Sequence, residues 1–216
     1  MDKMQNTIEV EYIGHISKNK FIELKERLEK EGSLKSTKNR LTLMYFRDKI
    51  PKDIKDVEDE KVDLKLRITN YQSELILKYG LFTGAHARDE ISFKFEENEF
   101  ENYIKLLMYL DWNWVVIYAT KTYVYNYKDV EFSLVEIYDF GYNFEIEILT
   151  SQSNEENARK KISDICDEFK IKHFDNEELR KQCNLINNTK ELQYDLRSIN
   201  FNDIKKRFRS FFREGD

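Results

Sequence analysis

The 216-residue sequence has little of what turns, linkers and disulfides are made from: one proline, six glycines and two cysteines. So few prolines and glycines argue against a disordered or linker-rich chain and favour a folded one. Cys166 and Cys183 do not form a CxxC pair, and no histidine pair stands near them at the spacing of a zinc site. We therefore expect two reduced thiols rather than a disulfide.

Long hydrophobic segments are also missing. The longest apolar stretch, from Trp112 to Ala119, is too short to cross a bilayer, and the first ten residues lack the apolar core of a signal peptide. We expect a cytoplasmic protein that does not contact a membrane. The basic, aromatic segment 204–213 is interpreted as a helix docked on the domain rather than as a membrane or nucleic-acid contact.

The formal net charge is −5 at neutral pH. This charge excludes a globally basic surface, so nucleic acid is not expected as a partner. Neither the phosphate-binding loop GxxxxGK[ST] nor the dinucleotide motif GxGxxG occurs in the sequence. Any site for an anion must therefore come from the local placement of lysine and arginine.

Hydrophobic periodicity predicts an α+β protein in which helices lie between and after the strands. Strands are expected at 8–13, 40–47, 62–69, 74–79, 90–95, 113–120, 121–127, 130–137 and 142–149. Helices are expected at 17–31, 96–110, 155–171, 176–186 and 201–212. No proline- or glycine-rich linker interrupts this pattern. We expect a single domain over residues 1–216, β-rich at about 8–149, with C-terminal helices at about 154–213.

Charged side chains sort by sign along the predicted strands. Glu9 and Glu11 stand two apart on one strand, and Glu145 and Glu147 do so on another. Side chains at this spacing point to the same face of a strand, roughly 6.5–7 Å apart, which suits a hard divalent cation such as Mg²⁺. Strand-borne lysine and arginine, such as the pair at positions 65 and 67, suit phosphate oxygens.

Each of these patterns taken alone is more typical of an ordinary strand. An E-x-E pair usually lies on a solvated face, and a K-x-R pair usually forms cross-strand ion pairs. Only the recurrence of the patterns in one order favours a functional site.

Five motifs follow one another along the chain. They are Glu9-Val10-Glu11, Leu64-Lys65-Leu66-Arg67, the strand ending Leu77-Lys78, Arg88-Asp89-Glu90, and Glu145-Ile146-Glu147 after a glycine. Their order and spacing resemble the CYTH superfamily, the triphosphate tunnel metalloenzymes. That superfamily includes class IV adenylyl cyclases, thiamine triphosphatases, inorganic tripolyphosphatases and RNA triphosphatases. The resemblance covers about residues 8–149.

The resemblance implies a closed, eight-stranded antiparallel β-barrel with flanking helices and a helical C-terminal cover. The barrel would be a tunnel that holds a triphosphate together with Mg²⁺ or Mn²⁺. The implied metal ligands are Glu9, Glu11, Glu136, Glu145 and Glu147. The implied phosphate-binding residues are Lys65, Arg67, Lys78, Arg88 and Lys121. The implied catalytic residues are Glu9, Glu11 and Glu90, and Glu90 either orients a basic neighbour or joins the metal shell.

The sequence departs from the family pattern at two positions. Ile13 stands where the first-strand motif ExExK has its lysine, and Tyr123 stands where a later K-x-R motif has its arginine. We expect a divalent-metal-dependent phosphohydrolase that acts on inorganic tripolyphosphate, a nucleoside triphosphate or thiamine triphosphate, as a monomer or homodimer. The alternatives are a class IV-type adenylyl cyclase making cyclic AMP and pyrophosphate, a catalytically impaired phosphate- or nucleotide-binding module, and a plain β-sandwich with charged faces.

Overall fold

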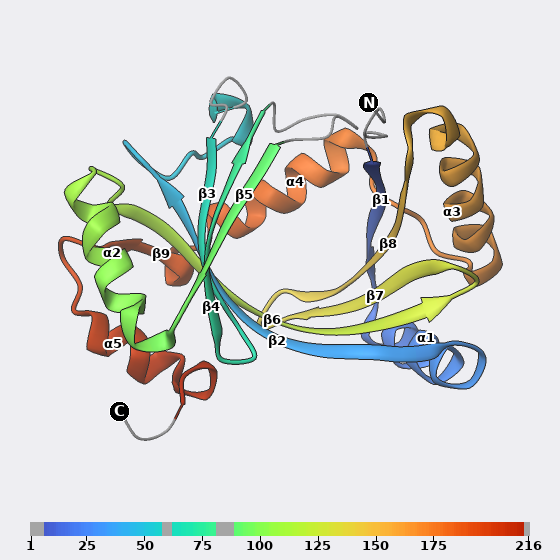
Figure 1. The fold of residues 1–216 in the computed structure, drawn as a ribbon, viewed down its shortest axis with the longest axis horizontal. Helices are drawn as coiled ribbons and strands as arrows, with labels where there is room; N and C mark the ends of the chain where they lie inside the picture. The colour runs from blue at the N-terminus through green and yellow to red at the C-terminus, as the bar shows by residue number, and fades with distance from the viewer. Residues whose placement is uncertain (1–6, 58–61, 81–88, 214–216) are drawn as a thin grey trace, which may run out of the picture. The chain divides into compact units, whose positions relative to one another are not determined.

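The computed structural model describes residues 7–57, 62–80 and 89–213. The described strands form one antiparallel sheet in the order β1-β8-β7-β6-β2-β3-β4-β5, with β9 paired to β6, and with its helices the chain is an α+β protein (Figure 1). The strands are β1 (Thr7–Ile16), β2 (Ser33–Phe46), β3 (Val62–Thr69), β4 (Gln72–Tyr79), β5 (Asp89–Phe95), β6 (Trp114–Tyr127), β7 (Val130–Ile137), β8 (Gly141–Ser151) and β9 (Gln193–Asp195). The helices are α1 (Lys18–Glu31), α2 (Phe100–Tyr109), α3 (Glu155–Phe169), α4 (Asn176–Asn187) and α5 (Phe201–Arg207).

The chain divides into two compact units, and β2 and β6 each run through both of them. The first unit comprises residues 1–38 and 121–175, and the second comprises residues 39–120 and 176–216. Each unit has its own buried hydrophobic cluster. The sequence-based expectation of a single domain stays a prediction.

In the first unit, α1 and α3 pack on one face of the sheet (Figure 1). Helix α1 begins after Ser17, whose hydroxyl accepts a hydrogen bond from the Lys20 amide at 3.2 Å. Its apolar side chains recur every three to four residues and are buried against the sheet. The opposite face of β1 and β8 is left for polar side chains, because strand residues alternate between faces.

The Glu168 carboxylate joins three parts of the first unit. It accepts hydrogen bonds from Arg27 of α1 at 2.6 Å, and from Tyr127 and Lys128 at the β6–β7 turn at 2.7 Å each. The contact with Lys128, followed by that with Tyr127, lowers the pKa of Glu168. This polar cluster therefore fixes α1 and α3 against the hairpin.

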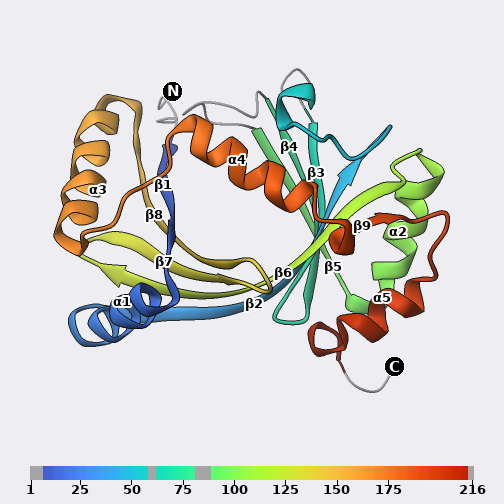
Figure 2. The same ribbon diagram turned by 180° about the vertical axis from the view of Figure 1, so that it is seen from behind.

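In the second unit, α2 and α5 lie on one side of β3, β4 and β5, and α4 lies on the other side (Figures 1 and 2). Leu64, Leu66 and Ile68 of β3 point toward α2 and α5 and are buried in the second cluster. The residues between them, including Lys65 and Arg67, point to the other face, where α4 lies. The β3–β4 connection is a two-residue turn at Asn70 and Tyr71, both with positive φ.

The structure corrects the bounds of two strands and adds a short third one. The expected strands 113–120 and 121–127 are one strand, β6, because no turn residue separates Thr120 from Lys121. Strand β2 begins at Ser33, seven residues before the expected start, because its polar first half shows no hydrophobic alternation. The short strand β9 was not predicted, since three residues carry no periodic signal.

The order of strands begins at β1 and ends at β5. An antiparallel sheet of the expected kind is therefore present, while its closure into a barrel stays a prediction. None of the described helices combines the length and the apolar character that a bilayer crossing requires.

Candidate functional site

Glutamates gather on the polar face of the first unit's sheet. Glu9 and Glu11 of β1 are exposed on this face, while Val10 between them is buried on the helix-covered side. In the strand register Glu11 lies opposite Glu147 of β8, and Glu147 lies opposite Glu131 of β7. Residues directly opposite one another point to the same face, so the three glutamates form a row across three adjacent strands.

Three of these carboxylates are close enough to share one cation. One ligand oxygen each from Glu9, Glu11 and Glu147 lies within 4.8 Å of the others, the one group of this kind in the described part of the chain. Carboxylate oxygens are the donors that Mg²⁺ and Mn²⁺ prefer. The donor set therefore fits a hard divalent cation, as the sequence predicts.

The electrostatics of Glu147 indicate a site that is short of positive charge. Burial, followed by repulsion from Glu9, Glu131 and Glu145, raises the pKa of Glu147 to about 7. Lys38 acts in the opposite direction without offsetting them. A carboxylate with such a pKa is stabilised in its charged form by any cation that binds beside it.

The other two predicted metal ligands lie on different faces. Glu145 lies opposite Ile13 and Ser133, on the same face as Glu147. Glu136 lies opposite Tyr142, on the helix-covered face, where the Tyr142 hydroxyl donates a hydrogen bond to it at 3.4 Å. The structure does not bring Glu136 to the acidic group, because it stands five positions after Glu131 on a strand whose side chains alternate between faces.

Lys121 likewise lies apart from the other predicted cations. A hydrogen bond with Tyr123 is the first cause of its raised pKa, and Tyr138 and Glu136 contribute to it. Its ammonium lies 5.2 Å from the centre of the Tyr123 ring. These contacts place Lys121 with Glu136 rather than with Lys65 and Arg67.

The second unit carries a cluster of cations on the face of β3 and β4 that is turned away from its hydrophobic cluster. Lys65 forms an ion pair with Asp63 at 2.9 Å, and Arg67 forms one with Glu74 at 3.4 Å. Their side chains are only 13% and 19% exposed. Burial lowers the pKa of Lys65, although Asp63 acts against this effect. Buried cations of this kind favour an anionic ligand, because an anion offsets their cost of desolvation.

Arg67 also retains an unused hydrogen-bond donor. Its Nε atom is buried and has no hydrogen-bond partner in the described part of the chain. Buried donors are almost always paired in folded proteins. A guanidinium with a free Nε matches the oxygens of a phosphate.

Lys78 and Glu90 lie opposite each other on β4 and β5 and form an ion pair at 3.0 Å. Both are more exposed than Lys65. The geometry therefore connects Glu90 to a basic neighbour. Arg88 lies outside the described residues.

Sequence reasoning missed several residues of these two faces. Asp63 and Glu74 are the partners of Lys65 and Arg67, and the period of two in Asp63-Leu64-Lys65 was the signal available for one of them. Glu131 was missed because its place beside Glu147 depends on the β7–β8 register. Tyr118, which hydrogen-bonds Thr42 and lies near Arg67, carried no sequence signal.

A family model for the CYTH domain matches residues 7–178. The chain belongs to the CYTH family. The match begins at β1 and ends within α4, so it includes every strand that bears the two charged faces. The sequence-based assignment to this family is confirmed.

Solved structures show the same fold at low sequence identity. A protein of Pyrococcus horikoshii is 20% identical with a TM-score of 0.62, covering 79% of this chain and 97% of its own. A putative adenylate cyclase from Vibrio parahaemolyticus is 13% identical with a TM-score of 0.55, covering 80% and 97%. A putative adenylyl cyclase from Hippeastrum, described as having a dominant triphosphatase activity, is 16% identical with a TM-score of 0.55, covering 77% and 89%. No curated protein matches the sequence.

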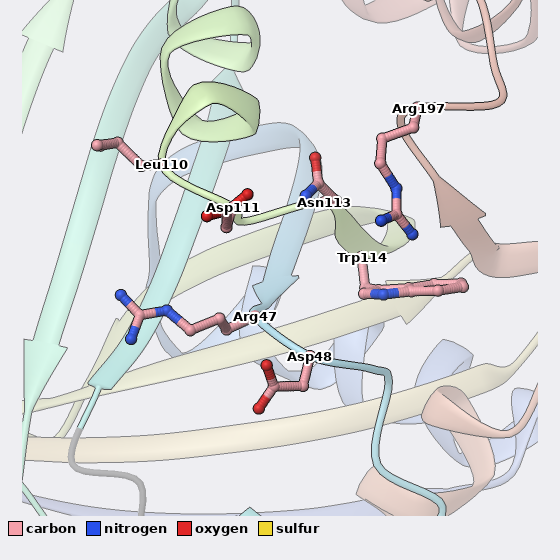
Figure 3. A pocket seen from close by; sticks show the side chains of 7 residues that line it. All are labelled: Arg47, Asp48, Leu110, Asp111, Asn113, Trp114 and Arg197. Carbon is pink, nitrogen blue, oxygen red and sulfur yellow. The ribbon is translucent and has the colours of Figure 1, made fainter.

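This CYTH domain has a hollow of about 580 Å³ beside the acidic row. Glu131 and Glu147 line it together with Lys35 and Lys128. A second hollow, of about 520 Å³, lies in the second unit and contains none of the predicted site residues (Figure 3). Its lining carries both charge signs, with Arg47 and Arg197 beside Asp48 and Asp111, so it does not indicate one kind of ion.

Proposed function

We propose that this CYTH domain is a divalent-metal-dependent phosphohydrolase that acts on a triphosphate bound in a β-barrel tunnel. The observation that supports this proposal most directly is the group formed by Glu9, Glu11 and Glu147, whose ligand oxygens lie within 4.8 Å of one another. The raised pKa of Glu147 adds to it, because the group is destabilised as long as no cation offsets its charge. Carboxylate donors suit hard divalent ions, and Mg²⁺ or Mn²⁺ is the ion that we propose.

In this proposal Lys65, Arg67 and Lys78 hold the phosphate groups. Each now pairs with an acidic side chain, namely Asp63, Glu74 and Glu90. A polyanion would exchange places with part of these contacts and would also use the free Nε of Arg67. Because Lys65 and Arg67 are largely buried, their attraction for an anion is less screened by water than that of surface cations.

Each part of the site has a separate chemical task. A bound divalent ion withdraws charge from the phosphoryl group and lowers the pKa of a water molecule. Glu9, Glu11 and Glu147 would hold that ion, with Glu145 on the same face. Lys65 and Arg67 would orient the phosphate chain and offset its charge as the bond to phosphorus breaks. Positioning and charge stabilisation account for most of the catalysis in such a reaction.

The test is the release of phosphate from tripolyphosphate, ATP and thiamine triphosphate, each with Mg²⁺ or Mn²⁺. We expect turnover of at least one substrate and a loss of about 100-fold or more in Glu147→Gln, which removes a metal ligand. Glu26→Gln is the matched control, because Glu26 is an exposed glutamate of α1.

The products separate the alternatives. Cyclic AMP with pyrophosphate from ATP would assign the domain to the cyclases. Absence of turnover for all three substrates, with the metal still bound, would contradict the hydrolase and favour a phosphate-binding module. Ile13 would then be the relevant feature, because β1 presents an apolar side chain opposite Glu145 where the family motif has a lysine.

A further inference from the structure

The row of glutamates on β1, β8 and β7 is unusual for an antiparallel sheet. Glu11, Glu147 and Glu131 lie directly opposite one another in the register. The Cβ atoms of directly opposite residues lie about 4.5–5.5 Å apart, and like charges at such positions destabilise the sheet. The arrangement therefore requires positive charge close by.

One lysine supplies such a charge from outside the row. The ammonium of Lys35 lies 2.5 Å from Oε2 of Glu131, whose side chain is only 18% exposed. Lys35 belongs to β2, and β6 lies between β2 and β7 in the strand order. Its side chain thus reaches past one strand to contact the row, which costs conformational entropy that an ordinary surface contact hardly offsets.

The contact with Lys35 also separates Glu131 from the other carboxylates. Glu131 acts on Glu147, since its charge is among the causes of the raised pKa there. It does not belong to the group whose ligand oxygens lie within 4.8 Å of one another, and that group consists of Glu9, Glu11 and Glu147. Lys35 and Glu131 line the same hollow as Glu147, so the carboxylate has open space beside it.

We propose that Lys35 is an internal counter-ion of the metal site: it binds Glu131 while no metal is present, and a divalent cation displaces it and takes Glu131 as a further carboxylate ligand. This inference rests on the proposed function, because it assumes that the acidic group binds a metal. It assigns roles to two residues, Lys35 and Glu131, that sequence reasoning did not select.

Competition between the ammonium and the metal has measurable consequences. In Lys35→Met the competitor is gone and Glu131 is free, so Mn²⁺ should bind about five-fold more tightly, because the ion pair between Lys35 and Glu131 no longer has to be broken before the metal binds. In Glu131→Gln the further ligand is lost, so Mn²⁺ should bind about five- to ten-fold more weakly. In the double variant the Lys35 substitution should change the affinity less than about two-fold, because Lys35 acts through Glu131.

The experiment is isothermal titration of the full chain with Mn²⁺ alone at pH 8 and low salt, for the wild type, both single variants and the double variant. Lys160→Met is the matched control, because Lys160 is an exposed lysine of α3 paired with Asp164 at 2.7 Å. It makes the same change in net charge away from the row. Lys35 is largely exposed, and Glu131→Gln keeps the shape of the side chain. Both variants should therefore keep the fold, and thermal unfolding checks this.

The outcomes distinguish a failure of the proposed function from a failure of the counter-ion role. If the wild type binds no Mn²⁺, the proposed function fails. If the wild type binds Mn²⁺ but Lys35→Met and Glu131→Gln leave the affinity unchanged, or if Lys160→Met tightens binding as much as Lys35→Met, the counter-ion role is overturned. Tighter binding in Lys35→Met that disappears in the Glu131→Gln background supports it.

Discussion

At the scale of single residues, Glu147 is the carboxylate of the acidic face on which burial and neighbouring charges act together. It stands between Glu11 and Glu131 in the register, and its side chain is more buried than those of Glu9 and Glu11. Burial and three neighbouring carboxylates all favour its neutral form. The same factors make the site responsive to any cation, since a bound ion reverses the balance in favour of the carboxylate.

The raised pKa predicts how the stability of the metal-free protein depends on pH. Between about pH 4.5 and pH 7 the unfolded chain releases the Glu147 proton while the folded chain keeps it. The unfolded state then binds fewer protons, so the free energy of unfolding falls as pH rises through this window. We expect Glu147→Gln to be more stable than the wild type by about 1–2 kcal/mol at pH 8, and equally stable below pH 4.5.

Urea denaturation in the presence of EDTA at pH 4.5, 6 and 8 measures this difference. A stability difference that stays constant across the three pH values would show that Glu147 has an ordinary pKa. Addition of Mn²⁺ at pH 8 should reverse the order, because only the wild type gains the free energy of metal binding at Glu147.

The sequence predicts which side chains share a face of a strand wherever the two residues stand on the same strand. The shared faces of Glu9 with Glu11, of Lys65 with Arg67 and of Glu145 with Glu147 follow from alternation alone, and the structure has them. Glu136 could not be placed in this way, because a register error of one residue moves a side chain to the other face. Glu131 and Lys35 depend on pairings between strands, which one sequence does not display.

At the scale of elements, β1 combines the acidic face with a close approach to the connection between α3 and α4. The amide of Phe174 donates a hydrogen bond to the carbonyl of Ile13 at 2.7 Å. A Cβ atom at Gly14 would lie 2.4 Å from the Lys172 carbonyl oxygen and 2.5 Å from the Phe144 ring. The glycine therefore lets this connection pack directly on the strand that carries Glu9 and Glu11.

Gly14→Ala should accordingly be destabilising. A backbone oxygen cannot rotate away as a flexible side chain can, so we expect a loss of about 2–3 kcal/mol from overpacking. Urea denaturation at one pH measures the loss. His15→Ala is the control on the same strand, since His15 is exposed and its substitution should change stability by less than about 1 kcal/mol. Equal effects of the two substitutions would mean that the connection moves away at little cost.

Helices with one apolar stripe were predicted well, and strands whose extent depends on pairing within the sheet were not. Helices α1 and α3 were expected near their observed bounds, because three to five buried side chains recur on one face of each. The first half of β2 is polar and mostly exposed, so its strand conformation comes from pairing within the sheet rather than from local pattern. The continuous strand β6 was divided in the prediction for the same reason, since its length is set by its neighbours.

At the scale of the whole molecule, two hydrophobic clusters stabilise two units, and each unit carries one of the charged faces. The helix-covered side of each unit supplies the apolar contacts, so the other side of its sheet is available for charge. The α+β class and the family were predictable, because hydrophobic periodicity and the order of the motifs can both be followed along the chain. The closed barrel that the resemblance implies stays a prediction, because closure depends on pairings between distant strands.

The most direct test of the account is a crystal structure of the protein soaked with Mn²⁺ and a triphosphate that it does not hydrolyse, recorded at a wavelength where manganese gives an anomalous signal. We expect an anomalous peak about 2.1 Å from carboxylate oxygens of Glu9, Glu11 and Glu147. We also expect phosphate oxygens within hydrogen-bond distance of Lys65 and Arg67. A peak at other residues, or a triphosphate bound away from these two cations, would contradict it.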